Sequence, residues 1–290
     1  MSVPPRIVCY GETLWDVLPQ GIFLGGAPLN VACHLAMWGV PIALISSVGN
    51  DFLGDEALKR LQTKGVDTRF IGRQNNRPTG TVKVRIDASG IPQYDFTEPV
   101  AYDQIKTNRL MVDAVSGAFA FVYGTLAQRG RGNTKSLNDL LQCRGPLKVY
   151  DVNLRPPCMN RSLVLELAAD ADLLKLNLEE LAWIMDTGLQ YISLPAATKA
   201  ISEKTETTRI CVTLGDQGVF YYDSGRTWQV PAPPVEVRDT VGAGDAFLAK
   251  LLYGLMLQMT VDEMLSDSCA YGASVAAING ALPVAEMVAL

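Results

Sequence analysis

The sequence predicts a layered α/β fold, because short apolar runs alternate with amphipathic stretches of helical period, as they do in βαβ units. The expected buried strands are residues 7–10, 43–47, 118–123, 148–152, 173–176 and 210–214. The expected helices are residues 30–38, 56–64, 136–142, 162–169 and 178–185. Ligands of such sheets bind at the carboxyl ends of the strands, so the segments that follow the strands are where we look for a site.

Length and composition indicate a single folded domain over residues 1–290. A hydrophobic content of 48% allows a large core, and no linker-like tract marks a boundary. The net charge of -5 and the pI near 5.0 disfavour nucleic acid and anionic membranes as partners. Because the sequence shows neither a signal-peptide pattern nor an apolar run long enough for a membrane helix, we expect a cytoplasmic protein.

The cysteines and the single histidine exclude several kinds of site. The cysteines are dispersed without a CxxC pair, which indicates buried thiols in a reducing compartment rather than disulfides or a zinc site. They are Cys9, Cys33, Cys143, Cys158, Cys211 and Cys269. His34 is the only histidine, so no triad or metal site can use two, and we expect a structural or surface role for it.

One region departs from the alternation of strands and helices. Residues 81–86 and 93–97 are half-polar strand candidates on either side of Ala88-Ser89-Gly90, which predicts a hairpin. This hairpin could project from the sheet as a lid, and an ordinary edge hairpin is the alternative.

The segment RDTVGAGDAF, Arg238 to Phe247, is the strongest candidate for chemistry. Its small residues Gly242-Ala243-Gly244 precede an apolar helical run, so their backbone N–H groups can approach an anion at the positive end of the helix dipole. Asp245 would be kept ionised by the dipole beside a bound phosphoryl group and could take the proton of an attacking hydroxyl. An ordinary helix N-cap is the alternative. The segment is not a Walker loop, since no GxxxxGK[ST] occurs. The GxGxxG fingerprint is also absent, which disfavours an oxidoreductase.

Two motifs far apart in the chain resemble the signatures of one family. DTVGAGDAF, from Asp239 to Phe247, resembles the C-terminal signature of the ribokinase-like (PfkB) carbohydrate kinases. GGAPLNVA, from Gly25 to Ala32, and SVGNDFLG, from Ser47 to Gly54, resemble the N-terminal signature in type, spacing and order. The resemblance covers essentially the whole chain. It implies a ribokinase-like layered α/β sheet with a small β lid, and transfer of the γ-phosphoryl group of ATP to a sugar hydroxyl with Asp245 as general base.

The resemblance implies a sugar site near the N-terminus. Asp16 and Asn30 match residues whose side chains bind sugar hydroxyls, and Gly25 and Gly26 match glycines that let the backbone approach the sugar. Directional hydrogen bonds of this kind orient a polyol. Without the resemblance, Asp16 would be a strand-end carboxylate and Asn30 a helix cap.

The resemblance also implies a phosphate and magnesium site. DVNLR, from Asp151 to Arg155, looks like the family's DxNxR segment, in which Arg155 would clamp phosphate oxygens. A surface ion pair is the alternative role for Arg155. Asn177 and Glu180 match an NxxE motif that helps hold Mg²⁺, largely through water, and their spacing puts both side chains on one face of a helical turn.

Further positions are carried over in the same way. Thr213, Gly215 and Gly218 match a TLGxxG turn that borders the nucleotide, although the same turn could simply lead into a strand. Asn279, in AAINGA, resembles the wall of an adenine pocket, and it could equally end a helix. Asp239 matches a position that in some members helps bind a monovalent cation such as K⁺.

One departure from the family concerns the lid. Only eight residues, 17–24, lie between Asp16 and Gly25, whereas typical fructokinase-like members have a longer excursion there. We therefore expect a reduced lid from residues 14–24 and 81–97. Lids exclude water, and in this family they often pair across a dimer, so a homodimer is one alternative for the assembly.

GETLWD followed by GGAPLNVA looks closer to bacterial fructokinases than to ribokinases or nucleoside kinases. The expected activity is therefore phosphoryl transfer from MgATP to a sugar, with fructose as the expected acceptor. A phosphorylated acceptor is less expected, because the sequence has no additional Lys/Arg cluster near the lid to neutralise a second phosphate. The alternatives are a kinase for another sugar or a nucleoside and a non-catalytic sensor, and the intact Asp245 and glycines speak against the sensor.

Overall fold

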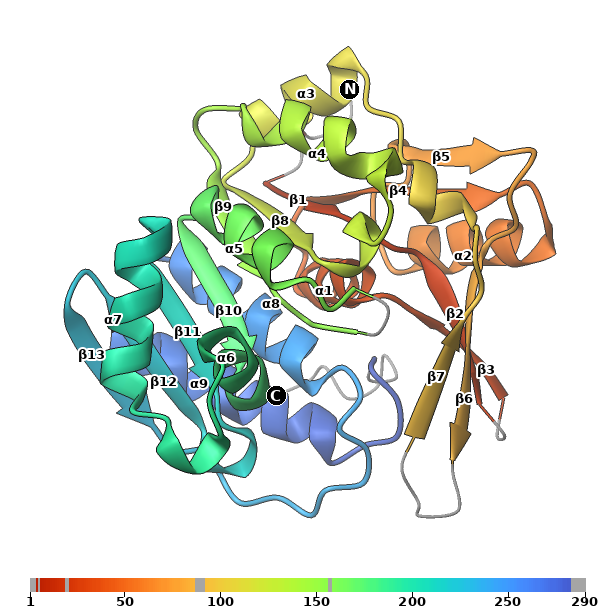
Figure 1. Cartoon of the computed structure of the whole chain (residues 1–290). Coiled ribbons are helices and arrows are strands. Elements are labelled where there is room, and N and C mark those ends of the chain that lie inside the picture. The colour runs from red at the N-terminus through yellow and green to blue at the C-terminus, as the bar shows by residue number, and fades with distance from the viewer. Residues whose placement is uncertain (1–3, 5, 19–20, 87–91, 156–157, 283–290) are drawn as a thin grey trace.

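The computed structural model describes residues 4, 6–18, 21–86, 92–155 and 158–282. Its centre is a nine-stranded sheet in the order β13-β12-β11-β10-β9-β8-β1-β4-β5 (Figure 1). Neighbouring strands from β11 to β5 are parallel, and β12 and β13 are added antiparallel at one edge. The strands are β1 Ile7–Tyr10, β4 Ile42–Gly49, β5 Ile71–Gln74, β8 Ala120–Gly124, β9 Leu147–Asp151, β10 Leu173–Asn177, β11 Arg209–Thr213, β12 Val219–Asp223 and β13 Arg226–Val230.

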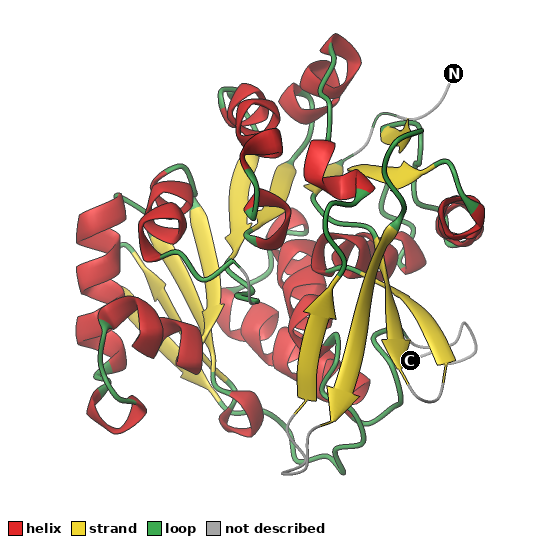
Figure 2. Ribbon diagram, turned by 45° about the vertical axis from the view of Figure 1, so that its right-hand side comes forward, coloured by secondary structure: helices red, strands yellow, loops and turns green. Residues whose placement is uncertain are grey.

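Helices cover both faces of this sheet (Figure 2). One face carries α1 Ala27–Met37, α2 Phe52–Thr63, α8 Ala243–Met256 and α9 Val261–Ala276. The other face carries α3 Arg109–Ser116, α4 Thr134–Leu141, α5 Arg161–Ala169, α6 Leu178–Met185 and α7 Leu194–Thr205. Short 3₁₀ turns occur at Ala101–Gln104, Leu126–Gln128, Arg131–Asn133, Leu189–Tyr191 and Gly215–Gln217.

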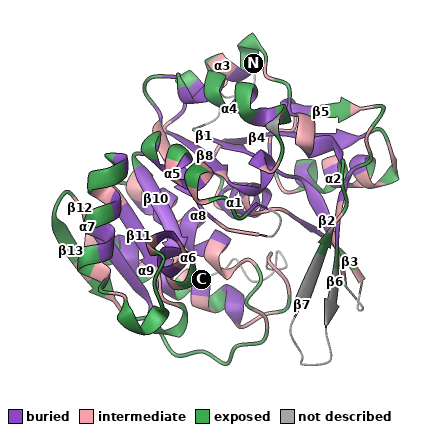
Figure 3. Cartoon of the chain, viewed as in Figure 1, coloured by how far each residue is buried: buried purple, intermediate pink, exposed green. Residues whose placement is uncertain are grey.

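The sheet is buried between two hydrophobic cores, as the colouring of Figure 3 shows. Along β1, Ile7 and Cys9 pack into the core under α1 and α8, while Val8 and Tyr10 pack into the core on the opposite face. This alternation follows from the two-residue period of a strand. It explains why the central strands read as continuous apolar runs, since both of their faces are covered.

A second, four-stranded sheet projects from the main body (Figure 1). Its strands are β3 Gly21–Gly25, β2 Leu14–Leu18, β6 Gly80–Ile86 and β7 Pro92–Phe96, in the order β3-β2-β6-β7. The antiparallel pair β6 and β7 is the hairpin expected from the sequence. The hairpin is not isolated, because β6 pairs with β2 and so joins the two expected lid segments. The expected turn Ala88-Ser89-Gly90 lies outside the described residues.

Several expectations about single residues can be compared with the fold. All six cysteines are buried and free, as expected. His34 is fully buried, so its role is structural rather than at the surface. Asp16 lies in the middle of β2 and is not a strand-end carboxylate. No helix in the described part of the chain has the length and apolarity needed to cross a membrane.

Candidate active site

The start of α8 lies where the glycine-rich segment was expected to bind an anion. Gly242 is the N-cap residue, with a left-handed φ of 78° that glycine adopts without strain. A Cβ atom on Gly242 would also collide with Ala281, so the position has room only for glycine. Within the described residues, the N–H groups of Gly244 and Asp245 have no protein acceptor. Free N–H groups in the first turn of a helix can bind an anion.

Asp245 is buried in the first turn of α8, with 9% of its surface exposed. Its Oδ2 accepts a hydrogen bond of 2.8 Å from Asn30 Nδ2, so the side chain does not cap its own helix. Burial, together with repulsion from Asp151, raises the pKa of Asp245 to about 6. The pKa is raised even though the start of a helix favours a carboxylate. The group is still mainly a carboxylate above pH 6, which is the form that a general base needs.

Asn30 links the start of α1 to the start of α8. Its backbone N–H donates to Gly26 O over 2.8 Å, so Asn30 lies inside the first turn and Gly26, not Asn30, is the N-cap residue. Its Nδ2 reaches Asp245, while its Oδ1 is buried without a hydrogen-bond partner. The structure therefore brings a predicted sugar-binding residue into contact with the predicted base.

Gly25 and Gly26 let two acidic residues lie against the start of α1. A Cβ atom on Gly25 would collide with the carboxylate of Asp16. Gly26 has a φ of 119°, and a Cβ atom there would lie 2.5 Å from the carbonyl oxygen of Glu12. Burial raises the pKa of Asp16 to about 6, while the charge of Arg155 opposes this shift.

A buried lysine that belongs to no motif recognised in the sequence lies beside the expected anion site. Lys175 Nζ donates to Asp151 Oδ1 and Oδ2 over 2.9 and 3.1 Å, and both side chains are almost fully buried. A Cβ atom on Gly244 would lie 3.1 Å from Lys175 Nζ. Burial acts to lower the pKa of Lys175, but the charges of Asp151, Glu180 and Asp245 outweigh it and raise the pKa. Lys175 is therefore a permanent cation beside Asp245.

Arg155 lies among the acidic residues of the site. Its charge acts to lower the pKa of Glu12, Asp16 and Asp245. Its Nη1 donates to Leu154 O over 2.8 Å, and no ion pair of Arg155 occurs within the described residues, so the surface ion pair considered above is not seen. A guanidinium whose charge is felt by three carboxyl groups can bind an anionic ligand.

Asn177 and Glu180 form a capping box at the start of α6. Asn177 Oδ1 accepts from Glu180 N over 2.8 Å, and Glu180 Oε2 accepts from Asn177 N over 2.8 Å. Glu180 Oε1 also accepts from Leu154 N, which ties α6 to the segment that carries Arg155. The two side chains share one face, as expected, but they are already bonded to the backbone, so they fit contact with a hydrated ion better than direct ligation.

The remaining expected nucleotide residues lie in two turns. Thr213 ends β11, and Gly215 and Gly218 have φ values of 61° and 96° in the turn that leads into β12. Asp239 Oδ1 accepts from Val241 N, and its Oδ2 accepts from Gly280 N, each over 3.0 Å. Asn279 is exposed and follows the end of α9. The two bonds of Asp239 attach the segment that carries Asn279 to the segment before α8.

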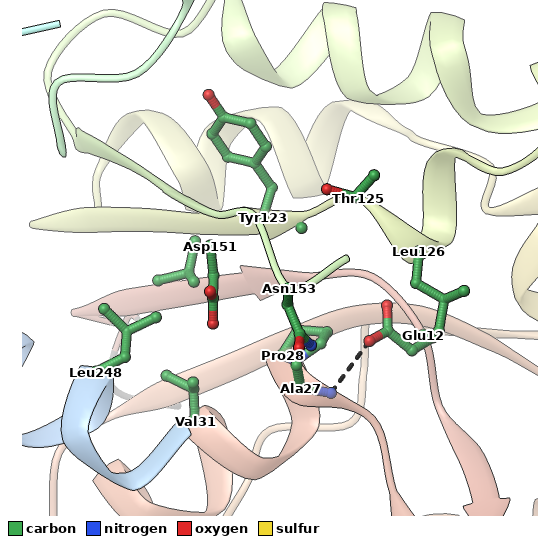
Figure 4. Close-up of a pocket in the computed structure, with 12 residues that line it drawn as sticks. Glu12, Ala27, Pro28, Val31, Tyr123, Thr125, Leu126, Asp151, Asn153 and Leu248 are labelled. Atoms are coloured by element: carbon green, nitrogen blue, oxygen red, sulfur yellow. Dashed lines mark hydrogen bonds between the residues drawn. The ribbon is translucent and has the colours of Figure 1, made fainter. Parts of the chain in front are cut away.

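A pocket opens at the carboxyl ends of the central strands, between α1, β8 and β9 (Figure 4). In Figure 4, Glu12 lies beside the start of α1, and Asp151 and Asn153 reach the same pocket from the end of β9. No role for Glu12 was predicted from the sequence. A usable signal was present, because Glu12 and Lys175 are charged residues next to or within apolar strand sequences, where charged side chains are rare unless they are paired.

Comparisons with known proteins agree with this arrangement. Residues 6–283 match the model of the pfkB family of carbohydrate kinases. This chain belongs to the pfkB family. Fructokinase-1 of Oryza sativa subsp. japonica is 29% identical, with 96% of this chain and 93% of that protein covered. The fructokinase of Klebsiella pneumoniae is 28% identical, with 96% and 95% covered.

A solved structure shows the same fold. A sugar kinase from Pyrococcus horikoshii in complex with ATP superposes with a TM-score of 0.81 at 25% identity, with 95% of this chain and 93% of that chain covered. The ribokinase-like α/β fold expected from the sequence is therefore confirmed. As a pfkB-family member that matches fructokinases over nearly its whole length, the protein is an ATP-dependent sugar kinase.

Proposed function

We propose that this pfkB-family kinase phosphorylates fructose, with Asp245 as the general base. The observation that carries the proposal is the hydrogen bond between Asn30 and Asp245, which connects the GGAPLN motif to the glycine-rich start of α8. A sugar bound by Asp16, Asn30 and the backbone at Gly25 and Gly26 would have a hydroxyl beside Asp245. The fructokinase relatives in rice and Klebsiella support fructose as the acceptor.

In this proposal, the free N–H groups at the start of α8 and the charge of Arg155 bind the transferred phosphoryl group. Asp245 accepts the proton of the attacking hydroxyl while these groups stabilise the developing negative charge. Lys175 lowers the pKa of Asp245 and so favours its ionised form. The ATP complex of the Pyrococcus relative supports ATP as the donor. In this proposal, the nucleotide lies beside Thr213, Gly215, Gly218 and Asn279.

A magnesium ion would be held mainly by the phosphates of ATP, with Asn177 and Glu180 contacting its water ligands. Among the described residues, no cluster of three or more His, Cys, Asp or Glu side chains could hold a metal by itself, which fits this arrangement. Mg²⁺ bound in this way supplies positive charge to the phosphate oxygens. A K⁺ ion beside Asp239 is a further part of the proposal, and replacing K⁺ with tetramethylammonium in the assay tests it.

The second sheet would act as the reduced lid of a single-domain cytoplasmic enzyme. The edge strand β3 exposes Ile22 and Phe23, with 50% and 42% of their surfaces accessible, which supports a homodimer formed through this sheet. Light scattering on the wild-type protein and on Phe23→Glu tests the dimer. If the wild-type protein and the variant both have the mass of a monomer, the dimer is contradicted.

The proposed substrate is tested by measuring ADP release with a panel of sugars and nucleosides. We expect fructose to give the largest kcat/KM, because binding and orientation of the acceptor differ between sugars. A larger value with another sugar would replace fructose while retaining the kinase reaction. ATP binding without ADP release for any acceptor would instead favour the non-catalytic sensor.

A further inference from the structure

Glu12 is held rigidly at the carboxyl end of β1, beside the GGAPLN motif. Ser46 Oγ donates to Gly11 O over 2.7 Å, and Thr13 Oγ1 donates to Ser46 Oγ over 2.9 Å, which fixes the backbone on both sides of Glu12. Glu12 Oε1 accepts from Ala27 N, the first residue of α1, over 3.1 Å. One carboxyl oxygen thus satisfies a helix N-terminus, and the side chain cannot swing away without losing that bond.

The other oxygen of Glu12 has no partner. Glu12 is 2% exposed, and its Oε2 is fully buried without a hydrogen bond within the described structure. A buried oxygen without a donor is costly, because it has given up water and gained nothing in return. The side chain lines the pocket that Asp151 and Asn153 also line, so a ligand in this pocket can reach Glu12 (Figure 4).

We propose that Glu12 is a further substrate-binding residue, whose Oε2 accepts a hydrogen bond from a hydroxyl of the acceptor sugar. This inference rests on the proposed sugar site beside Asp16, Gly25, Gly26 and Asn30. A sugar hydroxyl is a donor of the right chemistry, since it can satisfy one acceptor in a small enclosed space. The buried Oδ1 of Asn30 is a second unpartnered acceptor in the same region.

The charges around Glu12 are consistent with this role. Asp245 disfavours the charged form of Glu12, Arg155 favours it, and Tyr102 and Cys158 lie within electrostatic reach on another side. Burial raises the pKa of Glu12 to about 7, so at pH 8 the carboxylate is the main form and acts only as an acceptor. Holding α1 requires only the oxygen that accepts from Ala27 N, so a structural role leaves the buried, unpartnered Oε2 unexplained.

The test is Glu12→Gln, which keeps the oxygen that accepts from Ala27 N and replaces Oε2 with an amide that cannot accept. We expect the KM for the sugar at pH 8 to rise roughly tenfold or more, the effect of leaving a polar contact unmade. The KM for ATP should stay within about threefold of the wild-type value. The melting temperature at pH 8 should rise, because the variant no longer buries a charge.

An unchanged sugar KM in the folded variant would overturn the proposal, and so would equal increases in the KM values for sugar and ATP. Glu12→Asp provides a second variant, because it keeps the charge but withdraws the oxygens by one methylene group. It should also raise the sugar KM, and a wild-type value would count equally against the proposal. Glu263→Gln is the matched control, since its carboxylate accepts from Thr260 N at the exposed start of α9.

The comparison uses whichever sugar supports wild-type turnover. Failure of fructose as an acceptor would then contradict the proposed substrate. The sugar KM values of wild type and Glu12→Gln could still be compared with the sugar that is turned over. The two proposals therefore fail in different measurements.

Discussion

At the scale of single residues, Asp245 differs from a helix cap in its burial and in its side-chain partner Asn30. Asp245→Asn keeps the size of the side chain and the oxygen that accepts from Asn30, but it removes the proton acceptor. We expect kcat to fall at least about 100-fold with little loss of stability. Sugar-dependent ADP release and thermal unfolding should be measured together. A stable variant that keeps more than about a tenth of wild-type turnover would contradict the assignment.

The pH dependence of turnover should report the same residue. In the free enzyme the pKa of Asp245 is raised to about 6, so the carboxylate is the main form above this value and is lost as the pH falls through it. We expect kcat at saturating sugar and ATP to decrease about tenfold per pH unit below the pKa that Asp245 has in the complex with both substrates. Saturation keeps Asp16 and Glu12, which titrate nearby, from acting through sugar affinity. A kcat/KM for the sugar that stays flat from pH 5 to 8 would contradict Asp245 as the essential base, because kcat/KM reports the pKa values of the free enzyme.

Lys175 provides an independent test of the charges around the base. In Lys175→Met, the buried Asp151 loses its partner, and stability should fall by about 3–5 kcal/mol. The pKa of Asp245 should rise, because Lys175 lowers it and Asp151 raises it. The acid limb of the pH–kcat profile should therefore move to higher pH. Adding Asp151→Asn should restore part of the stability, whereas an unmoved acid limb would show that Lys175 does not influence the base.

At the scale of helices and strands, α1 connects the two halves of the site and also fixes the end of the described chain. His34 Nε2 lies 3.0 Å from Ala281 O, which can only accept, so Nε2 carries the proton. His34 Nδ1 then accepts from the hydroxyl of Tyr271 on α9, 2.9 Å away. The neutral histidine thereby holds Ala281 against Gly242, where α8 begins.

This contact should make stability depend on pH. Burial lowers the pKa of His34 from 6.5 to about 4, so the unfolded state takes up a proton more readily. The neutral His34 therefore contributes fully to the free energy of unfolding above pH 6.5. This contribution is lost as the pH falls toward 4, and the total loss is roughly 3 kcal/mol. The buried carboxyl groups have the opposite dependence, so the quantity to measure is the difference in unfolding free energy between wild type and His34→Gln. A difference that stays constant from pH 7.5 to 4.5 would contradict the prediction.

The sequence allowed prediction of the elements whose burial is complete. The central strands β1, β4 and β8 read as apolar runs because both faces are covered, and α6 was predicted with the bounds that it has in the structure. The edge strands β5 and β13 were missed because their exposed residues break the apolar pattern. The helices α7 and α9 were missed because polar or small residues interrupt their apolar positions. The eight-residue α3 was missed although its buried residues Met111 and Val115 have helical spacing.

The site was predictable only where a motif marks it. The bond between Asn30 and Asp245 joins two motifs, and the resemblance placed both in one site. Glu12 follows the end of β1 and Lys175 lies in the middle of β10, and their partners lie on α1, β9 and α8, so only the folded chain shows what surrounds them. A charged residue in an apolar strand indicates that a partner exists without identifying it.

At the scale of the whole molecule, the two sheets differ in how firmly they are held. The nine-stranded sheet has a large core on each face. The second sheet is attached through a small cluster that includes Leu14, Val82 and Tyr102, and through Trp15 and Leu24, which belong to one of the large cores. Local opening requires least free energy where few apolar contacts must break. The second sheet is therefore the part of the molecule best suited to move when substrates bind.

The resulting prediction concerns hydrogen–deuterium exchange. Asp16 lies on β2 and Gly25 ends β3, so a sugar bound by these residues would attach the second sheet to the start of α1. We expect sugar together with a non-hydrolysable ATP analogue to slow exchange in β2, β3 and β6, while β1, β8 and β10 stay protected throughout. Asp16→Ala should remove most of the slowing, because it breaks the link between the sugar and β2. Equal slowing in wild type and Asp16→Ala would show that the second sheet does not close through this residue, and no slowing in either would contradict a lid.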